Sequence, residues 1–344
     1  MAPAILSLLQ IGLLQAALLQ GTAAKSGERR ITNIFEPFAT PAAAERDIGL
    51  FVMLITAAIF VAVCALLIST MIRFRRKPED DERQEPPQVY GSNQIEIAWT
   101  FIPLLIIFVL IGVTARVIAV VQGANPGPAP VRARIIGHQW WFEVQFPELG
   151  VATANEIHVP VAGSSGPATM FQLESVDVIH SFWVPQLAGK LDMVPNRANT
   201  LWIDPTEPGT YLGNCAEYCG TQHANMLLRV TVEPKDEFLA WAAAQKASIN
   251  VNTQDVEGRQ VFESLSCVNC HAVRGTPANG KFGPDLTHVG SRQTIASGMI
   301  PNTPQNLRAW VNDAQEMKPG VLMPNMKLTK QELDSVVSYL VSLK

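Results

Sequence analysis

The sequence predicts a membrane-anchored protein of several domains: a two-helix transmembrane hairpin, an all-β Greek-key domain and a C-terminal all-α domain. Three observations support this order. Two stretches without a charged residue, Ile48–Ile72 and Ile97–Ala115, are long enough to span a bilayer as helices. Short runs of alternating apolar and polar residues begin at position 131. Helical periodicity replaces the alternation near the end of the chain, over Lys330–Leu343.

The N-terminal segment, residues 1–24, is apolar and ends in small residues, as a secretory signal peptide does. It has no lysine or arginine, so a third membrane helix is the alternative interpretation. Residues 25–47 are then expected to be an exported segment. A basic cluster at 73–77 follows the first span, and the positive-inside rule places it in the cytoplasm. The hairpin, residues 48–121, therefore has both ends on the outer side.

Residues 125–233 are expected to form the all-β domain. Turn residues such as Pro147 and Gly209 separate its strands. The expected strands are Val131–Ile136, Trp140–Phe146, Glu156–Val159, Met170–Glu174, Thr200–Ile203 and Leu227–Val232. Several short strands at this spacing favour a sandwich or a Greek-key barrel. A helix over 234–247, with Phe238, Leu239 and Trp241 on one side, begins the connection at 234–254 that leads to the C-terminal domain.

The stretch Asn214–Met226 reads NCAEYCGTQHANM and concentrates soft metal ligands in one loop. Its candidate ligands are Cys215, Cys219, His223 and Met226, and His180 supplies another imidazole from upstream. Thiolate, imidazole and thioether groups favour copper, whereas a zinc site would need four cysteine or histidine ligands. A disulfide is the third interpretation, but a cysteine pair explains neither the histidine nor the methionine.

These stretches resemble the dinuclear copper A site of cytochrome c oxidase subunit II, whose loop reads C-x-E-x-C-G-x-x-H-x-x-M. The resemblance implies that both loop cysteines bridge two copper ions. It also implies that His180 and Met226 complete one copper, and that His223 and the backbone carbonyl of Glu217 complete the other. The implied fold is a cupredoxin-like sandwich, in which the cysteine loop joins the last two strands and His180 lies on a neighbouring loop.

The C-terminal domain, residues 255–344, contains the motif C-x-x-C-H at Cys267, Cys270 and His271. This is the attachment signature of c-type haem, in which the cysteines bind the porphyrin covalently and the histidine ligates iron. A zinc knuckle is the alternative, but it lacks an obvious fourth ligand. The segment 318–324 resembles the Met-Pro loop of small cytochromes c and makes Met323 the expected sixth ligand. The alternatives are Met317 and Met326.

The segment Gly283–Leu286 resembles the proximal haem wall of that family, and His288 is expected to be a solvent-facing loop residue. A helix is expected over Gly258–Leu265, leading into the C-x-x-C-H motif.

Six positions resemble further functional positions of subunit II. Glu96 begins a stretch like E-x-x-W-T-x-x-P, whose glutamate stands at the mouth of a proton channel, although an interface anchor is the alternative. Trp140 matches the aromatic patch that receives electrons from cytochrome c. The stretch facing subunit I is matched by Lys190, Asp192 and Arg197. There the side chain of Glu217 would help to bind a magnesium ion shared with subunit I.

The resemblance as a whole implies the electron-input subunit of a proton-pumping cytochrome c oxidase in a bacterial cytoplasmic membrane. Electrons would pass from a fused haem c through copper A to the haem of subunit I, where oxygen is reduced to water. Expected partners are subunit I and the other oxidase subunits, membrane lipid, and a donor such as a cytochrome c or a quinol-oxidising complex. The alternatives are a nitric oxide reductase subunit and a free-standing membrane-tethered carrier. The net charge of −4 gives no indication of nucleic acid binding.

Overall fold

The computed structural model describes residues 33–75, 88, 90–123, 131–162, 169–249 and 255–344. The chain divides into two compact units, which are described separately: residues 43–125, and residues 1–42 together with 126–344. The predicted signal peptide, the residues 76–77 of the basic cluster and the part of the linker at 250–254 lie outside the described residues.

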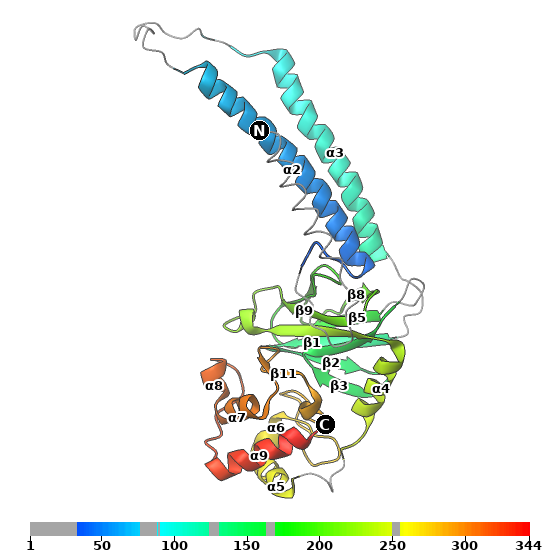
Figure 1. The fold of residues 1–344 in the computed structure, drawn as a ribbon, viewed down its shortest axis with the longest axis vertical. Helices are drawn as coiled ribbons and strands as arrows, with labels where there is room; N and C mark the ends of the chain where they lie inside the picture. Colours follow the sequence, from blue (N-terminus) through cyan, green and yellow to red (C-terminus); the bar gives the residue numbers. More distant parts are fainter. Residues whose placement is uncertain (1–32, 76–87, 89, 124–130, 163–168, 250–254) are drawn as a thin grey trace, which may run out of the picture. The chain divides into compact units, whose positions relative to one another are not determined.

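Two long helices, α2 (Thr40–Arg73) and α3 (Asn93–Gly123), contain the two predicted spans (Figure 1). Both are long and apolar enough to cross a membrane. Large apolar side chains along α2 are open to the surroundings, among them Leu54, Phe60 and Leu66 at 69% exposure each. This is the exposure expected of residues that face lipid rather than a protein core. Helix α2 begins eight residues before the predicted span, so residues 40–47 are helical.

The β domain consists of two five-stranded sheets. The first has the order β3-β2-β1-β5-β8 and the second the order β4-β10-β9-β6-β7. The bounds in the first sheet are β1 Val131–His138, β2 Trp141–Phe146, β3 Val151–Ala154, β5 Thr169–Ser175 and β8 Asn199–Ile203. Those in the second are β4 Glu156–Pro160, β6 His180–Trp183, β7 Leu191–Met193, β9 Gly209–Cys215 and β10 Leu227–Glu233. Pairs β1/β5 and β4/β10 are parallel and the other pairs are antiparallel.

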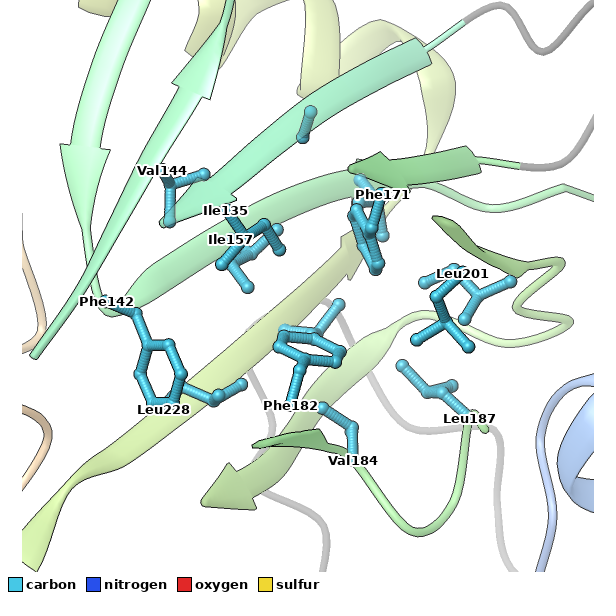
Figure 2. Close-up of a cluster of buried hydrophobic side chains, with 14 of the residues drawn as sticks. Ile135, Phe142, Val144, Ile157, Phe171, Phe182, Val184, Leu187, Leu201 and Leu228 are labelled. Carbon is cyan, nitrogen blue, oxygen red and sulfur yellow. The ribbon is translucent and has the colours of Figure 1, made fainter. Parts of the chain in front are cut away.

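The core of this domain lies between the sheets (Figure 2). Phe182 of β6 packs on Phe171 of β5 with ring centroids 5.5 Å apart, and on Phe142 of β2 at 6.5 Å. All three rings are at most 1% exposed. Burying one such side chain stabilises the fold by about 1.5–3 kcal/mol. This packing fixes β6, the strand that begins with His180.

All six predicted strands are present within two residues of their expected bounds, but β3, β6, β7 and β9 were not predicted. The expectation that His180 lies on a loop is wrong, because it is the first residue of β6. The strand reads HSFW, with two polar residues followed by two aromatic ones, and its first three residues are all buried. It therefore lacks the apolar–polar alternation by which a half-buried strand is recognised in a sequence.

Helix α4 (Lys235–Lys246) confirms the predicted helix after the last strand. Phe238 is buried, and Trp241 packs against Phe146 at 5.6 Å between ring centroids. Leu239 was expected on the same side but is 47% exposed. The buried stripe instead follows Phe238 through Ala242 and Gln245, the three- and four-residue spacing of a helix face.

The C-terminal domain is mainly helical, with a two-stranded ladder of β11 (Thr294–Ile295) and β12 (Ile300–Pro301). Its helices are α5 Val256–Ser264, α6 Cys267–Cys270, η2 Val289–Ser291, α7 Pro304–Asn312, α8 Ala314–Met317 and α9 Lys330–Ser342. Helices α5 and α9 cross closely at Gly258, where an added Cβ would lie 2.0 Å from the carbonyl oxygen of Ser335. Thr329 and Glu332 form a capping box that starts α9.

The prediction that His288 faces solvent is wrong. Its side chain is 5% exposed, and Nε2 donates to the carbonyl oxygen of Ala247, 3.1 Å away. Ala247 ends α4, so this histidine is covered by the segment that connects the two domains.

Candidate functional site

The cysteine loop closes on β6 to form a compact cluster of soft ligands. The ligand atoms of His180, Cys215 and Cys219 all lie within 4.8 Å of one another. The two sulfur atoms are 3.8 Å apart and both cysteines are free. His180 and both cysteines are at most 3% exposed. The pair is therefore not a disulfide, and its thiols point into a shared, water-poor space.

The remaining loop ligands surround the same sulfur pair. The Sγ of Cys219 lies 3.7 Å from Nδ1 of His223 and 3.8 Å from Sδ of Met226. The Sγ of Cys215 lies 3.2 Å from the backbone oxygen of Glu217. The structure thus gathers every residue that the sequence assigned to copper. Two sulfurs, two imidazoles, a thioether and a carbonyl make a soft donor set suited to copper rather than to magnesium or calcium.

The electrostatics of the sulfur pair also fit a cation. The hydrogen bond between the thiols lowers the pKa of Cys215, helped by His180, and raises the pKa of Cys219. One thiolate therefore forms readily, and a second beside it is unfavourable while no positive charge lies between them. Cations between the two sulfurs would remove that repulsion.

Asp177 supports the site and was not identified as a functional residue from the sequence. Its Oδ1 accepts a hydrogen bond from Nε2 of His180 at 2.8 Å, which leaves Nδ1 facing Cys215 at 4.0 Å. Burial lowers the pKa of His180, but the bonds to Asp177 and Cys215 outweigh it and leave the pKa raised. A carboxylate behind a ligating histidine is a common arrangement at metal sites, and it fixes the ring orientation. The sequence feature that could have indicated this role is an aspartate three residues before the histidine.

Trp140 lies directly against the cluster. Its Nε1 donates to the carbonyl oxygen of Cys219 at 3.0 Å, and the side chain of Gln139 donates to the same oxygen at 2.8 Å. Trp140 is 9% exposed, while Phe142 is fully buried in the core. Phe142 is therefore a core aromatic, whereas Trp140 has a direct link to a candidate ligand.

A cavity of about 320 Å³ occupies the C-terminal domain. Cys267, Cys270 and His271 line it, as the attachment motif requires. Met323 and Met326 also line it, but Met317 does not. One wall belongs to the β domain and consists of Gln139, Trp140, Trp141 and Asn155.

His271 is a candidate iron ligand whose ring is held in one orientation by a hydrogen bond. Its Nδ1 donates to the carbonyl oxygen of Pro284 at 2.8 Å, which leaves Nε2 available as a neutral ligand. Burial lowers the pKa of this histidine and so favours the neutral form. A Cβ on Gly283 would lie 2.6 Å from the ring, so this glycine fits closely against it. The segment expected to form the proximal wall does contact the histidine.

Arg292 is a further cavity residue that the sequence reasoning missed. Its Nε is buried and has no hydrogen-bond partner in the described part of the chain. Burial lowers its pKa, against the attraction of Asp285 and Glu156. An unpaired guanidinium donor at an apolar cavity fits a flat group that carries carboxylates, as haem does. No local motif marks this arginine in the sequence.

The other predicted site residues lie on the surface or in α3. Lys190 forms an ion pair with Glu217 at 3.4 Å, and both side chains are about half exposed. Asp192 lies in β7 and Arg197 is exposed shortly after it. Glu96 lies in the first turn of α3.

Three known families match successive parts of the chain. Residues 30–115 match "Cytochrome C oxidase subunit II, transmembrane domain". Residues 151–233 match "Cytochrome C oxidase subunit II, periplasmic domain", and residues 256–344 match "Cytochrome c".

Curated relatives match most of the chain. The cytochrome c oxidase subunit 2 of Alkalihalophilus pseudofirmus is 36% identical over 299 residues, covering 85% of each protein. That of Bacillus sp. strain PS3 is 33% identical over 291 residues, covering 79% of this chain and 80% of the relative. Among solved structures, the periplasmic domain of subunit II from Bradyrhizobium japonicum is 27% identical. It covers 35% of this chain and 96% of that domain, with a TM-score of 0.33.

Proposed function

The chain belongs to the cytochrome c oxidase subunit II family, and on that premise we propose that it passes electrons from its own haem c, through copper A, to the haem of subunit I. Its family membership makes it a subunit of a haem–copper oxidase, and its domains imply copper and haem. The order of the two centres, the covalent haem attachment and the individual ligands belong to the proposal.

One observation carries the proposed route between the two centres: Trp140 lines the haem cavity and is hydrogen-bonded to a candidate copper ligand. It lines the cavity that contains His271 and Met323, and it donates a hydrogen bond to the carbonyl of Cys219. A single side chain therefore separates the haem cavity from the copper ligands. An electron accepted at the cavity would have a short, water-poor route to the copper cluster.

The ligand roles follow from this arrangement. Cys215 and Cys219 would hold two copper ions between them, with the surrounding donors already in place. When bound, the copper pair would share one electron over both ions. The strands β6 and β9 and the hydrogen bond from His180 to Asp177 hold the ligands in position, which limits movement on a change of charge. Cys267 and Cys270 would attach haem, with His271 and Met323 on the iron.

The contacts with subunit I are part of the same proposal. We assign Glu96 to the mouth of a proton channel, and the surface around Lys190, Asp192 and Arg197 to the contact with subunit I. Glu217 would exchange its ion pair with Lys190 for a shared magnesium ion. The two spans would lie in a bacterial cytoplasmic membrane, with both redox domains outside.

The order of reduction tests the proposal. The purified oxidase is mixed with reductant in a stopped-flow spectrometer, and haem c and copper A are followed by their visible and near-infrared bands. We expect haem c to be reduced before copper A, or together with it. Reduction of copper A first, at a rate unchanged by Met323→Ala, would refute the proposed order. A preparation with haem c and copper but no partner subunit would instead indicate a free-standing carrier.

A further inference from the structure

We propose that two buried hydrogen-bonding side chains, Lys318 and Glu156, lock the haem domain onto the copper domain in one fixed position. Each side chain comes from one domain and is bound by groups of the other. Electron transfer would then occur between fixed centres, without a docking step. The functional meaning rests on the proposed function, but the contacts can be tested without it.

Lys318 carries the first half of the lock. It belongs to the haem domain and is 1% exposed. Its ammonium donates to the carbonyl oxygens of Trp140 at 3.0 Å, Asn225 at 2.8 Å and Ala296 at 3.4 Å. Three acceptors match the three donors of an ammonium group, and two of them belong to the copper domain. Asn225 directly precedes the candidate ligand Met226, so the contact is made at the copper loop.

Glu156 carries the second half, in the opposite direction. It begins β4 of the copper domain and is 4% exposed. Its carboxylate accepts hydrogen bonds from the backbone N–H of Gln293 at 3.0 Å and from that of Thr294 at 2.8 Å. The Thr294 hydroxyl donates to it at 2.8 Å. A buried carboxylate is stable only when its oxygens are satisfied, and here the other domain supplies these donors.

The turn at residues 296–298 of the haem domain packs closely against the copper domain. Ala296 and Ser297 have φ values of 53° and 62°, which residues other than glycine rarely adopt. Such a conformation persists where the surroundings enforce it. The carbonyl of Ser297 accepts from the N–H of Leu227 at 3.1 Å, across the same boundary. Gly298 follows, and a Cβ there would lie 3.1 Å from Leu227.

The amide groups that cross the boundary provide a direct measurement. The backbone N–H of Leu227 belongs to the copper domain, and those of Gln293 and Thr294 belong to the haem domain. In the purified oxidase with both cofactors bound, these amides should exchange slowly with deuterated solvent, because exchange requires the domains to separate. Peptide mass spectrometry follows both segments. Fast exchange of these amides in the wild type would overturn the proposal.

Lys318→Met removes the first half of the lock. Glu156→Gln weakens the second, because the amide keeps one acceptor oxygen and places an NH2 donor against a backbone N–H that bonded the other oxygen. Either change should speed exchange on both sides roughly 10- to 100-fold, since leaving buried hydrogen-bonding groups without a partner costs free energy on that scale. The matched controls are Lys330→Met and Glu148→Gln, which replace exposed residues of the same two domains. Faster exchange on only the mutated side would indicate a local structural role and contradict the lock.

The second measurement is internal electron transfer after flash photoreduction of haem c. In the wild type the rate should be insensitive to solvent viscosity, and in the lock variants it should become viscosity-dependent. If the Lys318→Met protein does not assemble, the exchange rates of Glu156→Gln and of the wild type still test the proposal. If exchange behaves as expected but copper A is reduced before haem c, the lock stands and the proposed function fails.

Discussion

Replacing Gly137 with alanine should disturb the copper cluster from the opposite sheet. Gly137 lies in β1, and a Cβ there would lie 2.6 Å from Cδ2 of His180 and 3.0 Å from Cγ. Ordinary contact begins at 3.4 Å, so the ring or the strand must move. The ring has little freedom, because it is fully buried and bonded to Asp177. Such overpacking costs about 1–3 kcal/mol.

The displaced ring should lower the affinity for copper more than it lowers the stability of the fold. Disturbing the support of a metal ligand lowers metal affinity by about 10- to 100-fold. The purified variant should therefore lose copper in a chelator titration before wild type does, and its mixed-valence electron-spin signal should change. Haem content should stay the same.

Gly150→Ala is the matched control for this change. Gly150 has a φ of 66° and open space around its Cβ position, so alanine there costs about 1–2 kcal/mol in backbone strain without touching the cluster. Its copper content and spectrum should match wild type. If Gly137→Ala also keeps both, the close contact with His180 does not control the site.

Three further predictions concern the other sites. Met323→Ala should lower the haem potential in a redox titration, because loss of the thioether ligand disfavours ferrous iron; a drop in Met326→Ala alone would reverse the assignment. Glu96→Gln should slow oxygen turnover while copper and haem content stay constant, and unchanged turnover would make Glu96 an interface anchor. Burial raises the pKa of Glu143, but bonds from His138 and Gln145 outweigh it and hold the pKa below 4.5. Its stabilising contribution is therefore present above pH 4.5 and is lost as the pH falls through the folded-state pKa. In Glu143→Gln the melting temperature should fall less than in wild type as the pH is lowered below 4.5. An equal fall in the two proteins would contradict this prediction.

The candidate ligand sets could be identified from the sequence because most of their members are close in sequence. The cysteine loop holds four candidate side-chain ligands between Cys215 and Met226, and C-x-x-C-H holds three candidate haem contacts in five residues. Their spacing is set by local backbone geometry, so the sequence alone indicates the chemistry. The long apolar spans and the alternating strands are local signals for the same reason.

Features that depend on distant packing could not be predicted. Strand β6 is buried on both faces and lacks alternation. Lys318 and Glu156 contact groups up to 178 residues away, and no local pattern distinguishes them from surface charges. His288 and the Nε atom of Arg292 are buried by segments that pack against them only in the folded chain. Such residues gain their roles from tertiary structure.

The shared wall of the haem cavity has a consequence for assembly. Trp140 and Trp141 come from the copper domain, while the attachment motif comes from the haem domain. A group filling this cavity touches both, so its binding and the closure of the two domains are thermodynamically linked. Closure of the domains strengthens binding of the group by the same free energy by which the bound group stabilises closure. A chain without the group should therefore also loosen around the candidate copper ligands, although the two sets of candidate ligands have no residue in common.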